Sequence, residues 1–146
     1  MASSFRPIAL SVGQQILHMK EVCPKLRLKS HGNRVVWTGL LRPGSITEAY
    51  LVEIDYRQNE RPAVRILAPP LEVSRSQFRE VHIFGDGSLC LHSDADWNPT
   101  MPISATVLLW VNEWLIYYEL WRATGQWYGG GEYLVSTSDK KRGRRK

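Results

Sequence analysis

The sequence predicts an α+β fold in which helices pack against one face of an antiparallel sheet. Three observations predict it. Apolar residues recur at three- and four-residue spacing near the start, four short β-rich runs follow, and a long apolar stripe at helical spacing occupies the second half. With 146 residues, 43% of them hydrophobic, the chain is long enough to bury a core of its own.

The first element is expected to be a helix that ends at Pro24, because proline cannot continue a helix. The apolar residues on one of its faces are Ala9, Val12, Ile16, Met19 and Cys23. Since Cys23 falls on this face, we expect a buried structural thiol there and not a reactive one.

Four short strands are expected next. They are predicted around Leu26 and Leu28, and at residues 35–41, 50–56 and 63–67. Turn-forming residues separate them at 31–33, 43–44 and 58–61. Connections this short imply an antiparallel meander, and Pro69-Pro70 ends it because proline supplies no ladder donor.

A long helix is expected in the second half, capped by Ser104 or Thr106 and ended by Gly125. Its apolar stripe consists of Val107, Leu108, Val111, Trp114, Leu115, Tyr118 and Trp121. A stripe of this kind indicates a core-facing helix. The glycines at 129–131 lack the lysine and the preceding strand of a phosphate-binding loop, so we interpret them as a flexible loop.

The basic character of the chain belongs to its last residues. The net charge is +5, with 19 Lys and Arg against 14 Asp and Glu, but six of the 19 lie in residues 140–146, and the remainder has a net charge of about −1. We therefore predict a domain at 1–135 and a basic, disordered tail at 136–146. We interpret the tail as a solubilising segment, and contact with nucleic acid or an acidic partner is the less favoured alternative.

The sequence predicts a cytoplasmic protein with reduced thiols. No leading segment resembles a signal peptide, and no apolar run approaches the length of a membrane helix, so no membrane partner is expected. Two cysteines in a chain of this size do not form a disulfide framework.

The stretch from Val81 to Pro99 concentrates the reactive residue types. Taken from the residues alone, Cys90 has three interpretations. It is a buried packing residue in Leu89-Cys90-Leu91, a metal ligand, or a nucleophile. The metal set would be Cys90, His92 and His82 with Cys23, His18 or His31. Only Cys90 and His92 are closely paired, whereas zinc sites use tightly paired ligands, so no metal is expected.

The nucleophile hypothesis depends on the residues around Cys90. Gly85-Asp86-Gly87 permits a sharp turn that would expose the sulfur on a loop. His82 lies close enough upstream to donate a hydrogen bond to an oxyanion, although a structural histidine is the alternative. Asp94 or Asp96 would orient or deprotonate an incoming amine.

These motifs resemble the ubiquitin-conjugating enzyme (UBC) family. That family has a Gly-x-hydrophobic-Cys-Leu motif followed by Trp-x-Pro and then a helix. This chain has Gly87-Ser88-Leu89-Cys90-Leu91, then Trp97-Asn98-Pro99, then an expected helix from Ile103 to Trp121. The resemblance spans residues 8–122 and implies the UBC-like fold: an N-terminal helix, a four-stranded meander, an active-site loop and a long C-terminal helix.

Two departures narrow the resemblance. The family's His-Pro-Asn is replaced by Glu80-Val81-His82, so His82 stands where the family has its asparagine; an imidazole can also donate the hydrogen bond. The C-terminal helices of eukaryotic members are missing after Trp121. In both respects the chain is similar to compact bacterial members, above all the stand-alone conjugating protein of short type II CBASS antiphage operons.

The resemblance implies a transferase. Cys90 would carry a protein C-terminus as a thioester and pass it to an amine, with His82 at the oxyanion and Asp94 or Asp96 at the acceptor. The implied partner is a cGAS-like nucleotidyltransferase, or alternatively a ubiquitin-like protein. No ATP-binding signature is present and no cofactor is expected, so either a separate activating enzyme or an already activated chain supplies the acyl group. A non-catalytic UBC-like interaction module is the remaining alternative.

Overall fold

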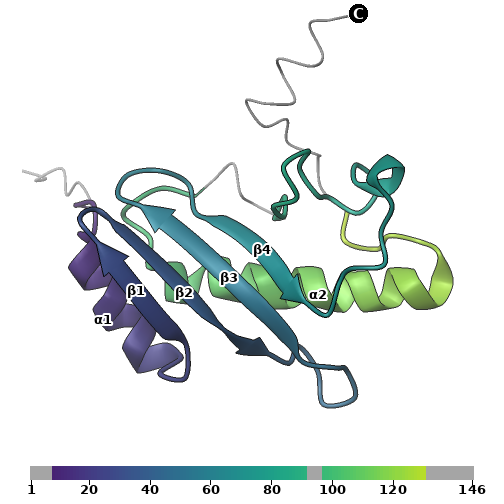
Figure 1. The fold of residues 1–146 in the computed structure, drawn as a ribbon, viewed down its shortest axis with the longest axis horizontal. Helices are drawn as coiled ribbons and strands as arrows, with labels where there is room; N and C mark the ends of the chain where they lie inside the picture. The colour runs from purple at the N-terminus through teal and green to yellow at the C-terminus, as the bar shows by residue number, and fades with distance from the viewer. Residues whose placement is uncertain (1–7, 92–96, 131–146) are drawn as a thin grey trace, which may run out of the picture.

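The structure is a computed structural model that describes residues 8–91 and 97–130. Its elements are α1 (Val12–Val22), β1 (Arg27–His31), β2 (Arg34–Leu41), β3 (Tyr50–Arg57), β4 (Ala63–Ala68), the short 3-10 helices η1 (Arg75–Gln77) and η3 (Ile103–Ala105), and α2 (Val107–Thr124). Both α-helices lie behind the sheet in Figure 1, which leaves the other face of the sheet uncovered by helices. The predicted α+β architecture is confirmed.

The sheet is the predicted meander, with strand order β1-β2-β3-β4 and every pair antiparallel. Gly32 and Asn33 connect β1 to β2 by a two-residue turn, and Gly32 has the positive φ of 59° that such a turn requires. Along β3, Val52, Ile54 and Tyr56 are buried, whereas the alternating residues are partly exposed. This alternation directs one face of the sheet to the core.

Helix α1 begins where Ser11 accepts a hydrogen bond from the Gln14 N–H, and Gln14 bonds back to Ser11. This capping box places Ala9 outside the helix, although the periodicity included it. Met19 is buried as predicted, and Cys23 caps the end of the helix, partly buried against the core.

One buried residue of α1 is polar, and the apolar pattern does not reveal it. The Gln15 side-chain amide donates to the Met101 carbonyl at 2.9 Å and accepts from the Ile103 N–H at 2.9 Å. Because both ends of the amide are satisfied, its burial carries little penalty. Gln15 thereby ties α1 to the chain that enters α2.

Helix α2 contributes Trp114, Tyr118 and Trp121 to the core, and every residue of its predicted stripe is buried. It begins at Val107, after η3, and not at Ile103. Thr106 is the N-cap, but its hydroxyl donates to the Pro102 carbonyl at 2.9 Å and does not accept from the helix. Gly125 ends α2 in the left-handed conformation, with φ at 78°.

Aromatic and polar contacts join α2 to the sheet. The ring of Tyr118 lies edge-on to that of Tyr50 on β3, with centroids 6.2 Å apart. The Tyr50 hydroxyl donates to Glu119 of α2, and burial together with this carboxylate raises the pKa of Tyr50 above its ordinary value. Tyr50 therefore remains a protonated donor at any physiological pH. None of the helices within the described ranges combines the length and apolarity needed to cross a bilayer.

Candidate active site

Indole groups of α2 hold the residues that lead into His82. The Trp114 Nε1–H donates to the Val81 carbonyl at 3.0 Å, and the Trp121 Nε1–H donates to the Glu80 carboxylate at 3.1 Å. Val81 is fully buried. Two residues of the core helix thus position the chain immediately before His82.

A tight turn follows, as the glycine pattern predicts. Ile83 and Leu89 form an isolated antiparallel bridge, and the Phe84 N–H donates to the Ser88 carbonyl at 2.8 Å. Gly87 has a φ of 89°, which an L-residue adopts only with strain. The Asp86 carboxylate accepts from the Ser88 N–H at 2.9 Å and from the Ser88 hydroxyl at 2.6 Å.

Asp86 is an ionised structural anchor of this turn. Partial burial raises the pKa of its carboxyl group, but the Ser88 hydrogen bonds and the Arg65 guanidinium outweigh that effect. The net pKa of Asp86 therefore lies below its ordinary value. Arg65 is 3.3 Å from this carboxylate and belongs to β4.

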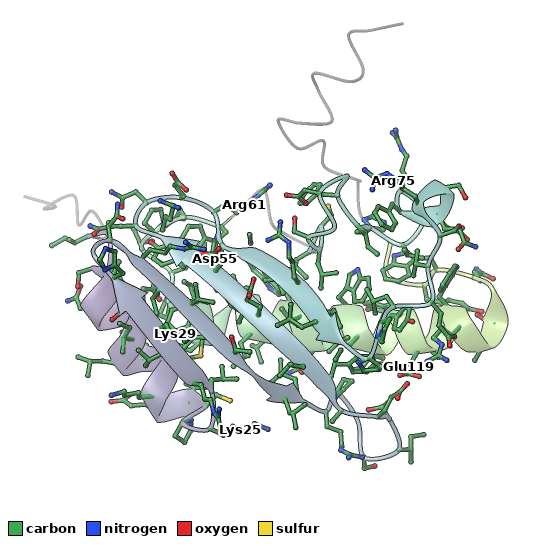
Figure 2. The ribbon with its side chains drawn as sticks, in the orientation of Figure 1. Lys25, Lys29, Asp55, Arg61, Arg75 and Glu119 are labelled. Carbon is green, nitrogen blue, oxygen red and sulfur yellow. The ribbon has the colours of Figure 1, made fainter. Side chains whose placement is uncertain are left out.

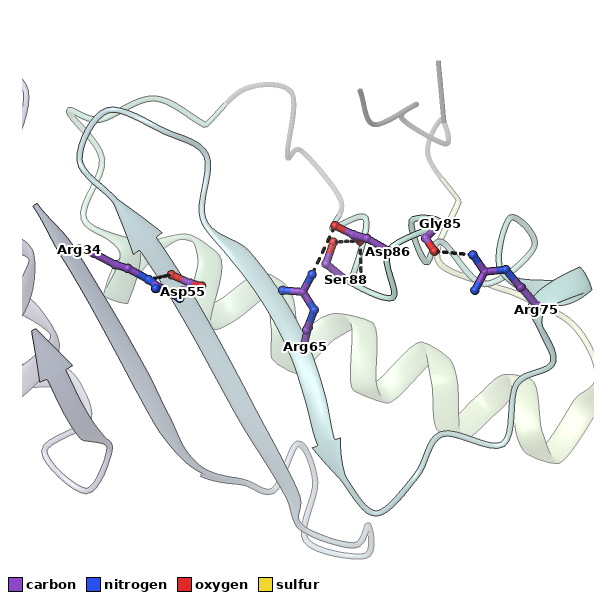
Figure 3. A network of polar contacts seen from close by, with 7 residues as sticks. All are labelled: Arg34, Asp55, Arg65, Arg75, Gly85, Asp86 and Ser88. Carbon is purple, nitrogen blue, oxygen red and sulfur yellow. Dashed lines mark hydrogen bonds and ion pairs between the residues drawn. The ribbon is translucent and has the colours of Figure 1, made fainter. Parts of the chain in front are cut away.

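Two further arginines contact the same turn from other parts of the chain, as Figure 3 shows for Arg75. Arg75 of η1 donates to the Gly85 carbonyl at 3.0 Å. The Arg61 guanidinium lies over the Phe84 ring at 5.0 Å from its centroid. Together with Arg65, these residues hold the turn from three separate segments, so its position relative to the sheet is well defined.

Cys90 follows the turn and is buried, with 2% of its surface exposed. The prediction that the turn would expose its sulfur is therefore wrong. The reason is that the Leu89 N–H donates to the Val64 carbonyl of β4 at 2.8 Å, which draws the segment against the sheet. Leu89 and Leu91 are also buried, as the packing interpretation of this run expected.

His82 and Cys90, predicted to act together, are brought together by the backbone. The Cys90 N–H donates to the His82 carbonyl at 2.9 Å. His82 itself has a φ of 56°, in the left-handed region that non-glycine residues seldom adopt. Asparagine is among the residues that tolerate this region best, and asparagine is what the UBC resemblance expects at this position.

Trp127 is a residue of this site that the sequence analysis did not identify. Its indole stacks on the His82 imidazole, with ring centroids 5.6 Å apart and planes 23° apart. It also contacts Trp114 and Tyr117 of α2. The only local signal is an aromatic residue just beyond the Gly125 helix end, and nothing in that pattern indicates which group it would cover.

Several predicted positions lie outside the described residues. These positions are Asp94, Asp96, His92 and the basic tail at 136–146. Trp97 is buried against Tyr56, with ring centroids 5.6 Å apart. Among residues 8–91 and 97–130, no three His, Cys, Asp or Glu side chains cluster as metal ligands would.

Comparison with known protein families identifies the chain. Residues 15–134 match the family described as Type II CBASS E2 protein. A search of curated proteins finds no match. The family match covers most of the chain, including the sheet, the segment around Cys90, α2 and Trp127. The chain therefore belongs to the type II CBASS E2 family, which indicates an E2-like conjugation role in antiphage defence.

Proposed function

We propose that this protein carries an acyl group on Cys90. The group would come from the C-terminus of a partner protein, and a cGAS-like nucleotidyltransferase is the partner we favour. The observation that carries the proposal is the 2.9 Å hydrogen bond from the Cys90 N–H to His82, in a chain of the CBASS E2 family. This bond joins Cys90, which matches the cysteine of the UBC motif, to His82, which stands where that motif has its asparagine.

The proposed reaction has two acyl transfers. The Cys90 thiolate attacks the carbonyl carbon of an activated C-terminus, the activating group leaves, and a thioester forms. An amine, such as a lysine Nζ, then attacks the same carbon. The carbon–sulfur bond breaks, the thiolate is regenerated, the amine loses a proton and an amide remains. The protein contributes by holding the thioester and the acceptor in reactive geometry.

His82 is proposed to stabilise the oxyanion of each tetrahedral intermediate. A ring N–H is a suitable donor, and the stacked Trp127 limits the orientations of the imidazole. Trp114 and Gln77 hold the backbone beside His82, because they bond to the Val81 carbonyl and N–H. The donor would therefore be set in place before the charge develops.

Asp94 and Asp96 keep their proposed role as groups that accept the proton of the attacking amine. Loading of Cys90 requires a donor that is already activated, because the sequence has no ATP-binding signature. The burial of Cys90 adds a requirement. Its sulfur must become accessible when the donor binds, since a thiolate reacts only with groups that reach it.

The test is trapping of the acyl group. The Cys90→Ser variant, produced in cells together with the nucleotidyltransferase and any activating enzyme of the same operon, is expected to accumulate an oxyester adduct. Intact mass spectrometry would show it as the sum of both chains minus water. The wild-type adduct should disappear with dithiothreitol, and the matched variant Cys23→Ser should behave as the wild type.

Two other outcomes are informative. If the adduct contains a ubiquitin-like protein in place of the nucleotidyltransferase, the proposed acyl donor is wrong but the proposed acyl transfer at Cys90 is retained. The burial of Cys90 favours a second candidate function, a non-catalytic interaction module. If Cys90→Ala protects cells from phage as well as the wild type and no adduct forms on Cys90→Ser, the acyl-carrier proposal is wrong and the module is the better description.

A further inference from the structure

The face of the sheet that the helices leave uncovered contains a second candidate site. A groove of about 470 Å³ lies over β1, β2 and the middle of β3. The side chains that line it are Arg27, Lys29, His31, Arg34, Val36, Thr38 and Glu53. Figure 2 labels Lys29 on β1, the first strand of the sheet. This groove is far in the strand order from Cys90, whose neighbour Leu89 bonds to β4 at the other edge.

The side chains that line the groove have a net positive charge, because Arg27, Lys29 and Arg34 outnumber the single carboxylate of Glu53. Arg34 forms an ion pair with Asp55, with nitrogen–oxygen distances of 2.9 and 2.7 Å (Figure 3). The side chains of Arg27 and Lys29, by contrast, form neither a hydrogen bond nor an ion pair within the described part of the chain. A partner that enters this groove can therefore bind Arg27 and Lys29 without breaking an existing ion pair.

The cationic side chains lie on an edge strand. In the described sheet, β1 pairs only with β2, and four of its five residues are exposed. In an antiparallel pair, alternate residues direct their N–H and C=O groups away from the partner strand. The free edge of β1 therefore has backbone donors and acceptors that an additional strand could pair with.

The spacing of the charged residues along β1 indicates which sequence of a partner strand would fit beside it. Arg27, Lys29 and His31 lie opposite Thr38, Val36 and Arg34, all on the uncovered face. Because β residues alternate between faces, a strand added beside β1 would place every second side chain next to these three residues of β1, of which Arg27 and Lys29 are cationic. Acidic side chains at those positions would form favourable cross-strand pairs, whereas basic ones would be repelled.

We propose that β1 and this groove bind an extended segment of a partner protein that has an acidic residue at every second position. The segment would pair with the backbone edge of β1 and place its carboxylates beside Arg27 and Lys29. Single-stranded nucleic acid is the less suitable ligand, because the lining contains no Trp, Tyr or Phe on which successive bases would stack. This site is independent of the proposed chemistry at Cys90.

The test is fluorescence anisotropy of the full-length protein with labelled peptides. One probe is Glu-Thr-Glu-Thr-Glu-Thr-Glu, and the other has the same composition with its glutamates in one block. Two matched charge pairs, with Arg27 and Lys29, should make the alternating peptide bind about tenfold more tightly. The basic tail at 136–146 attracts both peptides alike, so it does not produce this difference.

Variants locate the binding. The double variant Arg27→Glu/Lys29→Glu should lose the preference for the alternating peptide, whereas Lys20→Glu/Lys25→Glu, exposed residues with the same change of charge, should retain it. Hydrogen exchange supplies a measurement that needs no variant, since the alternating peptide should slow exchange of the β1 amides. Equal binding of both peptides, equal effects of the two double variants, no protection of β1, or tighter binding of single-stranded DNA through Arg27 and Lys29 would each overturn the proposal.

Discussion

The Trp127 indole stacks on the His82 imidazole at a centroid separation of 5.6 Å. The left-handed Gly125 ends α2 and lets the chain turn back so that Trp127 reaches this ring. The last described segment is therefore part of the candidate active site and does not merely follow the core helix. Figure 1 shows this segment, in yellow, leaving the end of α2 and turning back along the helix.

Replacement of Trp127 tests this contact. Trp127→Ala should remove the stacking contact on the imidazole and lower the rate of acyl transfer by about tenfold, because a misplaced donor stabilises the oxyanion poorly. Trp127→Phe keeps an aromatic face and should retain most of the rate. The His82 ring-proton shifts in NMR spectra should change with Trp127→Ala and remain in place with Tyr128→Ala, an exposed neighbour. An unchanged His82 spectrum in Trp127→Ala would contradict the contact.

Substitution of His82 separates its chemical role from its structural one. His82→Ala should reduce single-turnover transfer by about 100-fold if the ring donates to the oxyanion. His82→Asn should recover much of that loss, because asparagine offers an N–H donor and tolerates a φ of 56°. Thermal unfolding of both variants is the control. If both variants unfold at the same temperature, far below that of the wild type, the role of His82 is structural.

The Asp86 carboxylate should make stability depend on pH. Its pKa in the folded protein is lowered, so its stabilising effect is fully present above the unfolded pKa of about 3.9 and is lost as the pH falls through the folded value. Asp86→Asn should therefore be less stable than the wild type at pH 7, and the difference should shrink below about pH 4. Urea unfolding at several pH values measures this. A difference that is constant with pH would exclude the ionised carboxylate as its source.

Gly39 is required by close packing between β2 and the chain before β1. A Cβ at this position would lie 2.5 Å from Leu26 Cδ2, so Gly39→Ala should lower the free energy of unfolding by about 1–3 kcal/mol. Gly13 in α1 is the matched control, since nothing lies closer than 3.8 Å to a Cβ built there. Gly13→Ala should raise stability by about 0.5–1 kcal/mol through helix propensity. Denaturant unfolding of both variants measures these opposite signs.

Reactivity of the two cysteines should follow their exposure. Cys90 is 2% exposed, whereas Cys23 is only partly buried, so N-ethylmaleimide should modify Cys23 about tenfold faster in the free protein. Peptide mapping by mass spectrometry distinguishes the two sites. Addition of the nucleotidyltransferase that we propose as the partner should accelerate labelling of Cys90. Faster labelling of Cys90 in the free protein would show that its sulfur is accessible without a partner.

Much of the fold could be predicted because its signals are local. The apolar stripe of α2 and the alternation along β3 each record which side faces the core, and both were correct. The predicted boundaries of both helices were less accurate. Ser11 caps α1 after Ala9, and η3 precedes α2, because capping and hydrogen bonds such as those of Gln15 decide where a helix begins.

The candidate site was predictable only in part. The glycines around Asp86 indicated the turn before Cys90, and the turn is present. The turn alone does not decide whether the Cys90 sulfur is exposed, since a turn can lead a residue inward as well as outward. The hydrogen bond from Leu89 to Val64 decides the direction, and it joins the turn to a strand that precedes it by many residues.

The sequence by itself determined the order of the secondary-structure elements, the antiparallel meander and the pairing of Cys90 with His82 as residues of interest. Each of these depends on residue types at short spacing, which a linear pattern records. Only the tertiary structure decided that Cys90 is buried, that Trp127 covers His82, and that Arg27 and Lys29 share a groove with residues of β2 and β3. These relationships are contacts between distant segments, and the free energy that selects them comes from packing the whole core.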